Sequence, residues 1–257
     1  MVAGRETDPA RAKMTAKIYV VSLGPGGRSQ MTERAVKALE ACDVITGYNV
    51  YIDLIRDDFP GKKFISNGMR KEVDRCKATL EEALKDQTVA IVSSGDAGVY
   101  GMAGIMCQVA AEHPEVDIEV IPGVTAACSG AAVLGAPLIC DFCLISLSDL
   151  LTPWEKIEKR LACAAQGDFC IAIYNPRSHK RKDYLKKACD ILLQTQSGDI
   201  PCGIVYNIGR EGESYELTTL KELGANENVD MFSTVIIGNS QSKVINGRIV
   251  TPRGYHL

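Results

Sequence analysis

Residues 89–111 read VAIVSSGDAGVYGMAGIMCQVAA, and this stretch decides the fold. Its first four residues are all apolar, which is typical of a strand covered on both faces within a parallel sheet. A loop containing Gly95, Gly98 and Gly101 follows, and residues 102–111 then predict a helix. Strand, glycine-rich loop and helix in this order predict an α/β architecture.

The same alternation extends in both directions along the 257 residues. Hydrophobic patterns predict further strands at 18–21, 44–46, 118–121, 142–147, 169–174, 203–206 and 234–237, and helices at 32–41, 71–85, 126–134, 155–164 and 180–194. We therefore expect two α/β domains with mainly parallel sheets, at 17–122 and 142–257, joined by a linker helix region at 123–141. Residues 1–16 are polar and are interpreted as a disordered leader or tag.

Composition argues against several classes of protein. A net charge of −3 does not fit a general nucleic-acid binder, which is normally basic. No apolar run reaches the ~18 residues of a membrane span, and the N-terminus lacks the apolar stretch of a secretory signal. The ten cysteines are scattered through apolar segments, which favours buried thiols in a reducing cytoplasm. Cys140 and Cys143 have no second pair at matching distance, and residues three apart on a strand face opposite sides, so we expect no metal site.

Three loops follow apolar strands, at 22–27, 93–101 and 121–126. Ligands of open α/β sheets bind beyond the carboxyl ends of the strands, and glycine lets the backbone approach a ligand closely. The nicotinamide pattern G-x-G-x-x-G fails here, because Ser29 stands where the third glycine would follow Gly24 and Gly26. The P-loop pattern is also absent, so phosphate-bearing cofactors are not favoured. As an alternative, Asp96 and Thr125 would only cap the helices that follow them.

Six short stretches carry a resemblance to a known family. They are Leu23–Gly26, Gly95–Asp96, Pro122–Ala126, Ile173–Pro176, Tyr206–Arg210 and Thr234–Asn239. In this order and spacing they resemble the tetrapyrrole methylase family, over residues 17–250. Residues 94–104, 145–154 and 174–178 are most similar to the branch that methylates carbon 17 of precorrin-3B or cobalt-factor III in cobalamin biosynthesis. Ala97 stands where many members of the family have proline, a residue that would stiffen this loop.

The resemblance implies a methyltransferase with S-adenosylmethionine held in the cleft between two α/β domains. It also implies a small-molecule tetrapyrrole substrate and a homodimer, while the charge and hydropathy of the chain indicate no nucleic-acid or membrane partner. Asp96 would face either the positive end of the cofactor or its ribose. By position, the cofactor site would be lined by Pro25, Gly95, Asp96, Val99, Thr125, Ala126, Tyr174, Tyr206 and Thr234.

The substrate carries many carboxylates, so its binding site should hold local positive charge. Arginine grips carboxylates with two parallel hydrogen bonds. Basic residues cluster at 69–71 and at 177–182, which includes His179; a solvated helix face is the alternative for 180–182. The segment 152–155 has the pattern of a capping box, with Thr152 as the cap and Glu155 reaching back. The candidate substrate-binding residues are Arg70, Ser146, Asp149, Arg177 and Arg210.

Methyl transfer from a sulfonium to an electron-rich carbon needs alignment and exclusion of water more than an acid–base pair. The sequence agrees, since it offers three histidines and no Ser/His/Asp arrangement. No residue is assigned as catalytic, and the proton donor or acceptor for ring contraction is left open. The leading hypothesis is methylation of carbon 17 with ring contraction. The alternatives are a sister enzyme acting at carbon 11 or 20, a nicotinamide-dependent oxidoreductase and a non-catalytic tetrapyrrole carrier; whether the substrate contains cobalt stays open.

Overall fold

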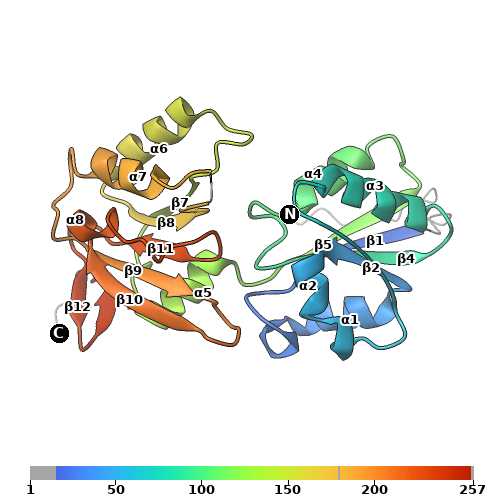
Figure 1. Ribbon diagram of the computed structural model, residues 1–257. Helices are drawn as coiled ribbons and strands as arrows, with labels where there is room; N and C mark the ends of the chain where they lie inside the picture. Colours follow the sequence, from blue (N-terminus) through green and yellow to red (C-terminus); the bar gives the residue numbers. More distant parts are fainter. Residues whose placement is uncertain (1–15, 179, 256–257) are drawn as a thin grey trace, which may run out of the picture. The chain divides into compact units, whose positions relative to one another are not determined.

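A computed structural model describes residues 16–178 and 180–255 (Figure 1). The predicted leader, apart from Ala16, and His179 lie outside the described residues. The chain divides after Thr125 into two compact units, so the segment 123–141 contributes its helix to the second unit. The first strand begins at Ala16. Within the described residues, no helix is long and apolar enough to cross a membrane.

The first unit is built on a five-stranded sheet in which every pair of neighbours is parallel. Its strands, in the spatial order β3-β2-β4-β1-β5, are Lys63–Asn67, Val44–Tyr48, Thr88–Ser93, Ala16–Ser22 and Val116–Ile121. One face is covered by α1 (Glu33–Ala41) and α2 (Asn49–Asp53), and the other by α3 (Glu72–Ala83) and α4 (Ala103–Val109) (Figure 1). Burial on both faces explains the apolar run that begins at Val89.

The connections of this sheet diverge at the neighbouring strands β1 and β4. The chain leaves β1 into α1 on one face, whereas it leaves the neighbouring β4 toward α4 on the opposite face. Where successive connections diverge in this way, the loops leave a crevice at the carboxyl ends of the strands. The glycine-rich loops at 22–27 and 93–101 both start at this switch point.

The second unit has a mixed sheet of five strands in the order β10-β9-β11-β8-β7. Three of its four neighbouring pairs are antiparallel, so the expectation of a mainly parallel sheet is wrong for this unit. These strands are Ser214–Thr219, Pro201–Tyr206, Thr234–Ile237, Cys170–Tyr174 and Phe142–Ser146. Helices α6 (Trp154–Gln166), α7 (Tyr184–Leu192) and α8 (Leu220–Leu223) pack on one face, and α5 (Ala126–Leu134) packs on the other. Beside α5 lies a small sheet of β6 (Gly135–Ala136), β12 (Lys243–Ile245) and β13 (Arg248–Val250).

The predicted capping box at the start of α6 is wrong. The helix begins at Trp154, and its N-cap position is Pro153, which makes no side-chain cap bond. The register is therefore one residue later than the pattern predicted, and Thr152 lies outside the cap. Glu155 instead lies in the first turn, where its negative charge is favourable for the helix dipole.

Candidate active site

The loops that follow β1 and β4 are joined to each other. The Gly24 N–H donates to the Gly95 carbonyl at 3.0 Å, and the Gly95 N–H donates to the Gly24 carbonyl at 2.7 Å. Both residues have left-handed backbone, with φ of 69° and 68°, a conformation that costs glycine nothing. The two loops therefore form one continuous backbone surface at the switch point.

The loop after β5 is held to this surface through Gly123 and Asp96. The Asp96 carboxylate accepts the Gly98 N–H at 2.8 Å on one oxygen and the Gly123 N–H at 2.9 Å on the other. A Cβ on residue 123 would lie 2.6 Å from the Gly95 carbonyl oxygen and 2.7 Å from the Ser22 Cβ. Only glycine allows this approach, so all three predicted loops meet in one place.

Asp96 is therefore a residue that organises the loops. As a helix cap it would accept an N–H from the first turn of α4, but that helix begins at Ala103 after an N-cap at Met102. The helix-cap alternative for Asp96 is wrong, because both of its oxygens serve the loops.

The other predicted cofactor residues of the first unit lie in the same loops. They are the buried Pro25, together with Val99 and Thr125, while Ala126 begins α5 in the second unit. Ser93, which sequence reasoning did not select, ends β4 at this surface. Its hydroxyl is buried and has no hydrogen-bond partner among the described residues. Buried polar groups are normally paired, so this hydroxyl is suited to a ligand.

Tyr174, Tyr206 and Thr234 lie at one edge of the second sheet. Strands β8 and β9 both run opposite to β11, so the two tyrosines end their strands where Thr234 begins β11. Asn175 and Asn207 follow the tyrosines with φ of 52° and 49°. Asparagine tolerates this left-handed conformation better than most residues, and here it turns the chain sharply out of the sheet.

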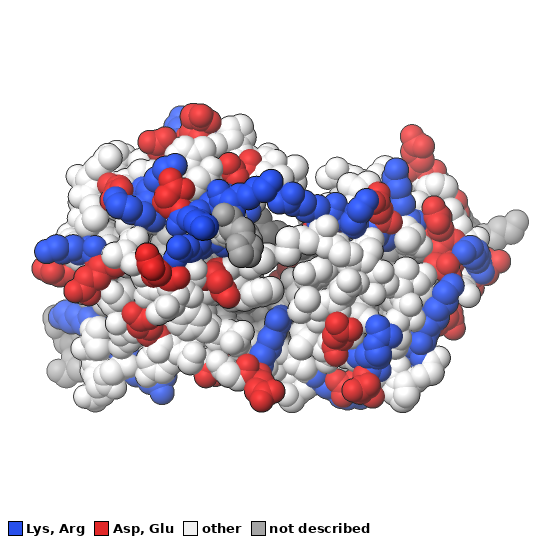
Figure 2. Space-filling view, viewed as in Figure 1, with Lys and Arg blue, Asp and Glu red and all other residues white. Residues whose placement is uncertain are grey.

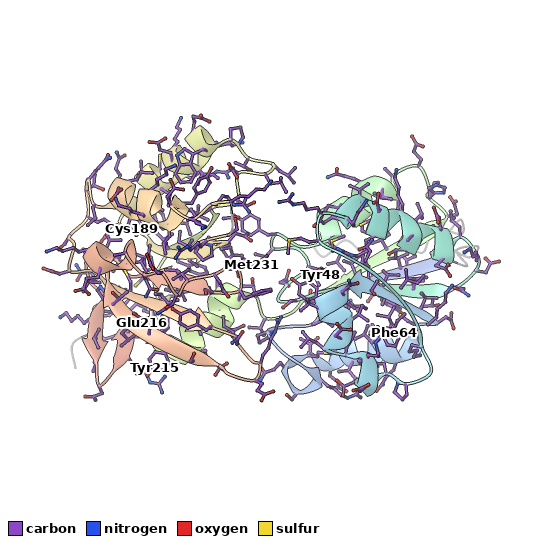
Figure 3. All side chains as sticks on the ribbon, viewed as in Figure 1. Tyr48, Phe64, Cys189, Tyr215, Glu216 and Met231 are labelled. Carbon is purple, nitrogen blue, oxygen red and sulfur yellow. The ribbon has the colours of Figure 1, made fainter. Side chains whose placement is uncertain are left out.

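The two tyrosine hydroxyls have different surroundings. The Tyr174 hydroxyl accepts the Ala127 N–H at 2.7 Å, which fixes the start of α5. The Tyr206 hydroxyl is buried and has no hydrogen-bond partner among the described residues. Burial first, and then the carboxylate of Glu216 on the neighbouring β10 (Figure 3), raises the pKa of the Tyr206 phenol.

Ser146 and Asp149 lie at and beyond the end of β7, at this same edge. Ser146 is in register with Tyr174 and accepts the Asn175 side-chain amide at 3.0 Å. Asp149 accepts the Tyr184 hydroxyl at 2.6 Å and Nη1 of Arg181 at 3.0 Å. The Tyr184 hydroxyl, and then Arg181, holds the pKa of the Asp149 carboxyl below its usual value.

Arg181 is a residue whose place sequence reasoning missed. The alternative that put residues 180–182 on a solvated helix face is wrong, because α7 begins only at Tyr184. Lys180 and Lys182 are exposed, whereas 20% of the Arg181 side chain is exposed. The sequence alone does not show that Arg181, the middle of three basic residues, turns inward, because this depends on the position of Asp149.

We expect Asp149→Asn to reduce the free energy of unfolding at neutral pH and to have progressively less effect in acid. The folded-state pKa of Asp149 lies below its unfolded value of about 3.9. The contribution of the carboxylate is therefore fully present above about pH 4 and is lost as the pH falls through the lower folded value. Urea unfolding of both proteins between about pH 7 and 3 measures this; a difference that does not shrink at the acid end would contradict it.

The other predicted arginines lie on turns at the carboxyl edges of the two sheets. Arg177 donates to the Glu227 carbonyl at 2.7 Å, and Arg210 lies in the turn between β9 and β10. Figure 2 shows Lys and Arg side chains gathered on the visible face of the second unit, around α7. In the first unit, Arg70 is exposed between β3 and α3 with φ of 64°.

Arg75, on α3, supports the turn that carries Arg70. Its side chain is almost fully buried, and it donates to the Asn67 side chain at 2.9 Å and to the Gly68 carbonyl at 3.1 Å. Burial lowers the pKa of Arg75. Sequence reasoning missed this residue, because a single arginine within a helical pattern reads as a solvated position.

The C-x-x-C pair does not form a shared site. Cys140 contacts the Pro252 carbonyl, whereas Cys143 contacts the Cys170 carbonyl, at 3.8 Å and 3.9 Å. Across residues 16–178 and 180–255, no three His, Cys, Asp or Glu side chains gather as a metal would need.

The expectation of buried thiols holds for Cys42, Cys76, Cys170, Cys189 and Cys202, whereas Cys107, Cys128 and Cys163 are exposed.

Sequence comparison identifies a family and several relatives whose descriptions agree with one another. A family profile described as Tetrapyrrole (Corrin/Porphyrin) Methylases matches residues 17–224. The chain is 45% identical to the probable cobalt-factor III C(17)-methyltransferase of Salmonella typhimurium, over 93% of this chain and 100% of the relative. It is 38% identical to the precorrin-3B C(17)-methyltransferase of Sinorhizobium sp, over 94% of this chain and 98% of the relative.

Solved structures agree with the fold. The methyltransferase CobJ matches with a TM-score of 0.86 and 34% identity, over 92% of this chain and 100% of that structure. A uroporphyrin-III C-methyl transferase from Thermus thermophilus, complexed with S-adenyl homocysteine, matches with a TM-score of 0.70 and 20% identity, over 86% and 97% of the two chains. The second match shows the fold alone. The profile and the full-length relatives confirm the resemblance in the sequence, and the chain belongs to the tetrapyrrole (corrin/porphyrin) methylase family.

Proposed function

We propose that this chain transfers the methyl group of S-adenosylmethionine to carbon 17 of cobalt-factor III or precorrin-3B, with ring contraction, in cobalamin biosynthesis. The observation that carries the proposal is the identity of 38–45% with relatives of that name over almost the whole chain. A homodimer in the cytoplasm belongs to the same proposal and rests on the family resemblance and the cysteine pattern.

The three joined loops support the choice of cofactor. Residues 22–27, 93–101 and 121–126 contain neither the nicotinamide glycine pattern nor the P-loop pattern, which does not favour a phosphate-bearing ligand. S-adenosylmethionine has no phosphate, and its polar edges suit backbone N–H groups and hydroxyls. The hydroxyl of Ser93, which is buried and has no hydrogen-bond partner within the described part of the chain, fits such a ligand. When bound, the cofactor supplies an activated methyl group on a sulfonium.

In this proposal the protein contributes binding and alignment. Rigid loops cost no reorganisation when the reacting atoms meet, and correct alignment replaces much of the entropic barrier. The cofactor would be held by Pro25, Gly95, Val99, Thr125, Ala126, Tyr174, Tyr206 and Thr234, with Asp96 holding the loops together. Arg70, Arg177 and Arg210 would bind the carboxylates of the substrate. Ser146 would contact the substrate through its hydroxyl, and Asp149 would lie beside the bound substrate.

The test is an anaerobic incubation with S-adenosylmethionine and, in parallel, cobalt-factor III or precorrin-3B. Product mass and absorbance spectrum are the two readouts. One added methyl with the spectral change of ring contraction is the expected result, and the preferred substrate decides between the cobalt and metal-free forms. An added methyl without contraction would point to a sister enzyme acting at another carbon. Binding of a nicotinamide cofactor instead of S-adenosylmethionine would overturn the proposal.

A further inference from the structure

The loop between β7 and α6 carries two adjacent exposed leucines. Leu150 is 60% exposed and Leu151 is 91% exposed. Single exposed apolar residues are common on proteins and need no explanation. These two differ because the residues directly before them are firmly held.

Three hydrogen bonds fix the base of this loop. Nη1 of Arg181 donates to the Ser148 hydroxyl at 3.1 Å and to Asp149 at 3.0 Å, and the Tyr184 hydroxyl donates to Asp149 at 2.6 Å. The Tyr184 ring packs on Trp154, with 4.5 Å between ring centroids. The exposed leucines therefore directly follow two residues whose side chains are held by hydrogen bonds.

The loop also leaves the sheet at a specific place. It follows Ser146, which lies in register with Tyr174 at the edge where Thr234 begins β11. A corrin precursor has a broad apolar ring system with carboxylates around its rim. An apolar tip fits the face of such a ring, whereas Arg177, on the turn after the neighbouring β8, fits its rim.

We propose that Leu150 and Leu151 form the contact surface for the apolar face of the tetrapyrrole ring, and that Arg181 and Asp149 hold this surface in place. This inference rests on the proposed function. It changes the role assigned to Asp149, since one carboxylate oxygen accepts from Arg181 and the other from Tyr184 on α7. Neutralisation by Arg181 also limits the repulsion between Asp149 and a substrate rich in carboxylates.

The test compares Leu151→Ser with Leu151→Met and with Val244→Ser as a matched control. Val244 is 53% exposed on β12, in the separate small sheet. We expect Leu151→Ser to raise the KM for the tetrapyrrole about tenfold, the change typical of removing one buried leucine contact. In Leu151→Ser, the kcat and the Kd for S-adenosylmethionine should both stay within about twofold of wild type. Leu151→Met should have a KM close to that of wild type.

Absorbance titration of the pigment gives its Kd without turnover and separates the two proposals. If wild type transfers no methyl but Leu151→Ser still weakens pigment binding, the proposed function fails and the ring-contact surface stands. If wild type is active and Leu151→Ser leaves both KM and pigment Kd unchanged, the ring-contact surface is overturned. An equal loss in Val244→Ser would overturn it as well.

Discussion

Gly123→Ala is expected to lower the affinity for S-adenosylmethionine, and with it kcat/KM, by about 100-fold while the chain stays folded. The new Cβ would meet the Gly95 carbonyl oxygen at 2.6 Å, the Ser22 Cβ at 2.7 Å and the Gly24 N at 3.1 Å. None of these atoms is the far end of a flexible side chain, so the third loop must move away from the first two. Displacement of a binding loop by about 1 Å is enough for a loss of this size.

Gly104→Ala is the matched control, because a Cβ there meets nothing within 4 Å. Gly104 lies in α4, where alanine favours the helix by up to about 1 kcal/mol, so this variant should bind the cofactor normally. Calorimetric titration gives the affinity, and circular dichroism reports the fold of each variant. Affinity within about threefold of wild type in Gly123→Ala would contradict the expectation.

The order of strands and helices was accessible from the sequence wherever burial leaves a strong pattern. The apolar run at 89–92 and the amphipathic helix at 32–41 are confirmed as β4 and α1. Two edge strands, and the direction of one central strand, were not predicted. β3 and β10 are edge strands, and β10 is exposed at Ser214–Glu216, so neither carries a clear apolar pattern. The antiparallel course of β11 also leaves no local mark, since direction is set by tertiary connections.

The candidate site was predictable as loops but not as contacts. Glycines after apolar strands indicate where a backbone approaches a ligand, and the structure brings the loops at Gly24, Gly95 and Gly123 together. What the sequence leaves open is which side chains turn inward. The inward turn of Arg181 depends on Asp149, which lies 32 residues away in the chain. That pairing follows from the packing of α7 beside the loop after β7.

Asp96→Ala is expected to lower kcat/KM about 100-fold or more, because it removes the acceptor for two backbone amides at once. Each hydrogen bond to a charged group contributes about 1.5–3 kcal/mol, and the Gly98 and Gly123 N–H groups would both lose a partner. Asp96→Asn should fall between wild type and alanine. Its oxygen accepts one of the two amides, while its NH2 group faces the other donor.

The double variant Asp96→Ala/Gly123→Ala shows how Asp96 acts. If the carboxylate works by holding the third loop, the loop is already displaced in Gly123→Ala, and the second substitution adds little to the loss in kcat/KM. If the carboxylate instead binds the cofactor directly, the two losses multiply to about 10,000-fold. We expect the smaller combined loss, because one oxygen of Asp96 accepts the Gly98 N–H of its own loop and the other accepts the Gly123 N–H. Fully multiplicative losses would return Asp96 to the role of a direct ligand.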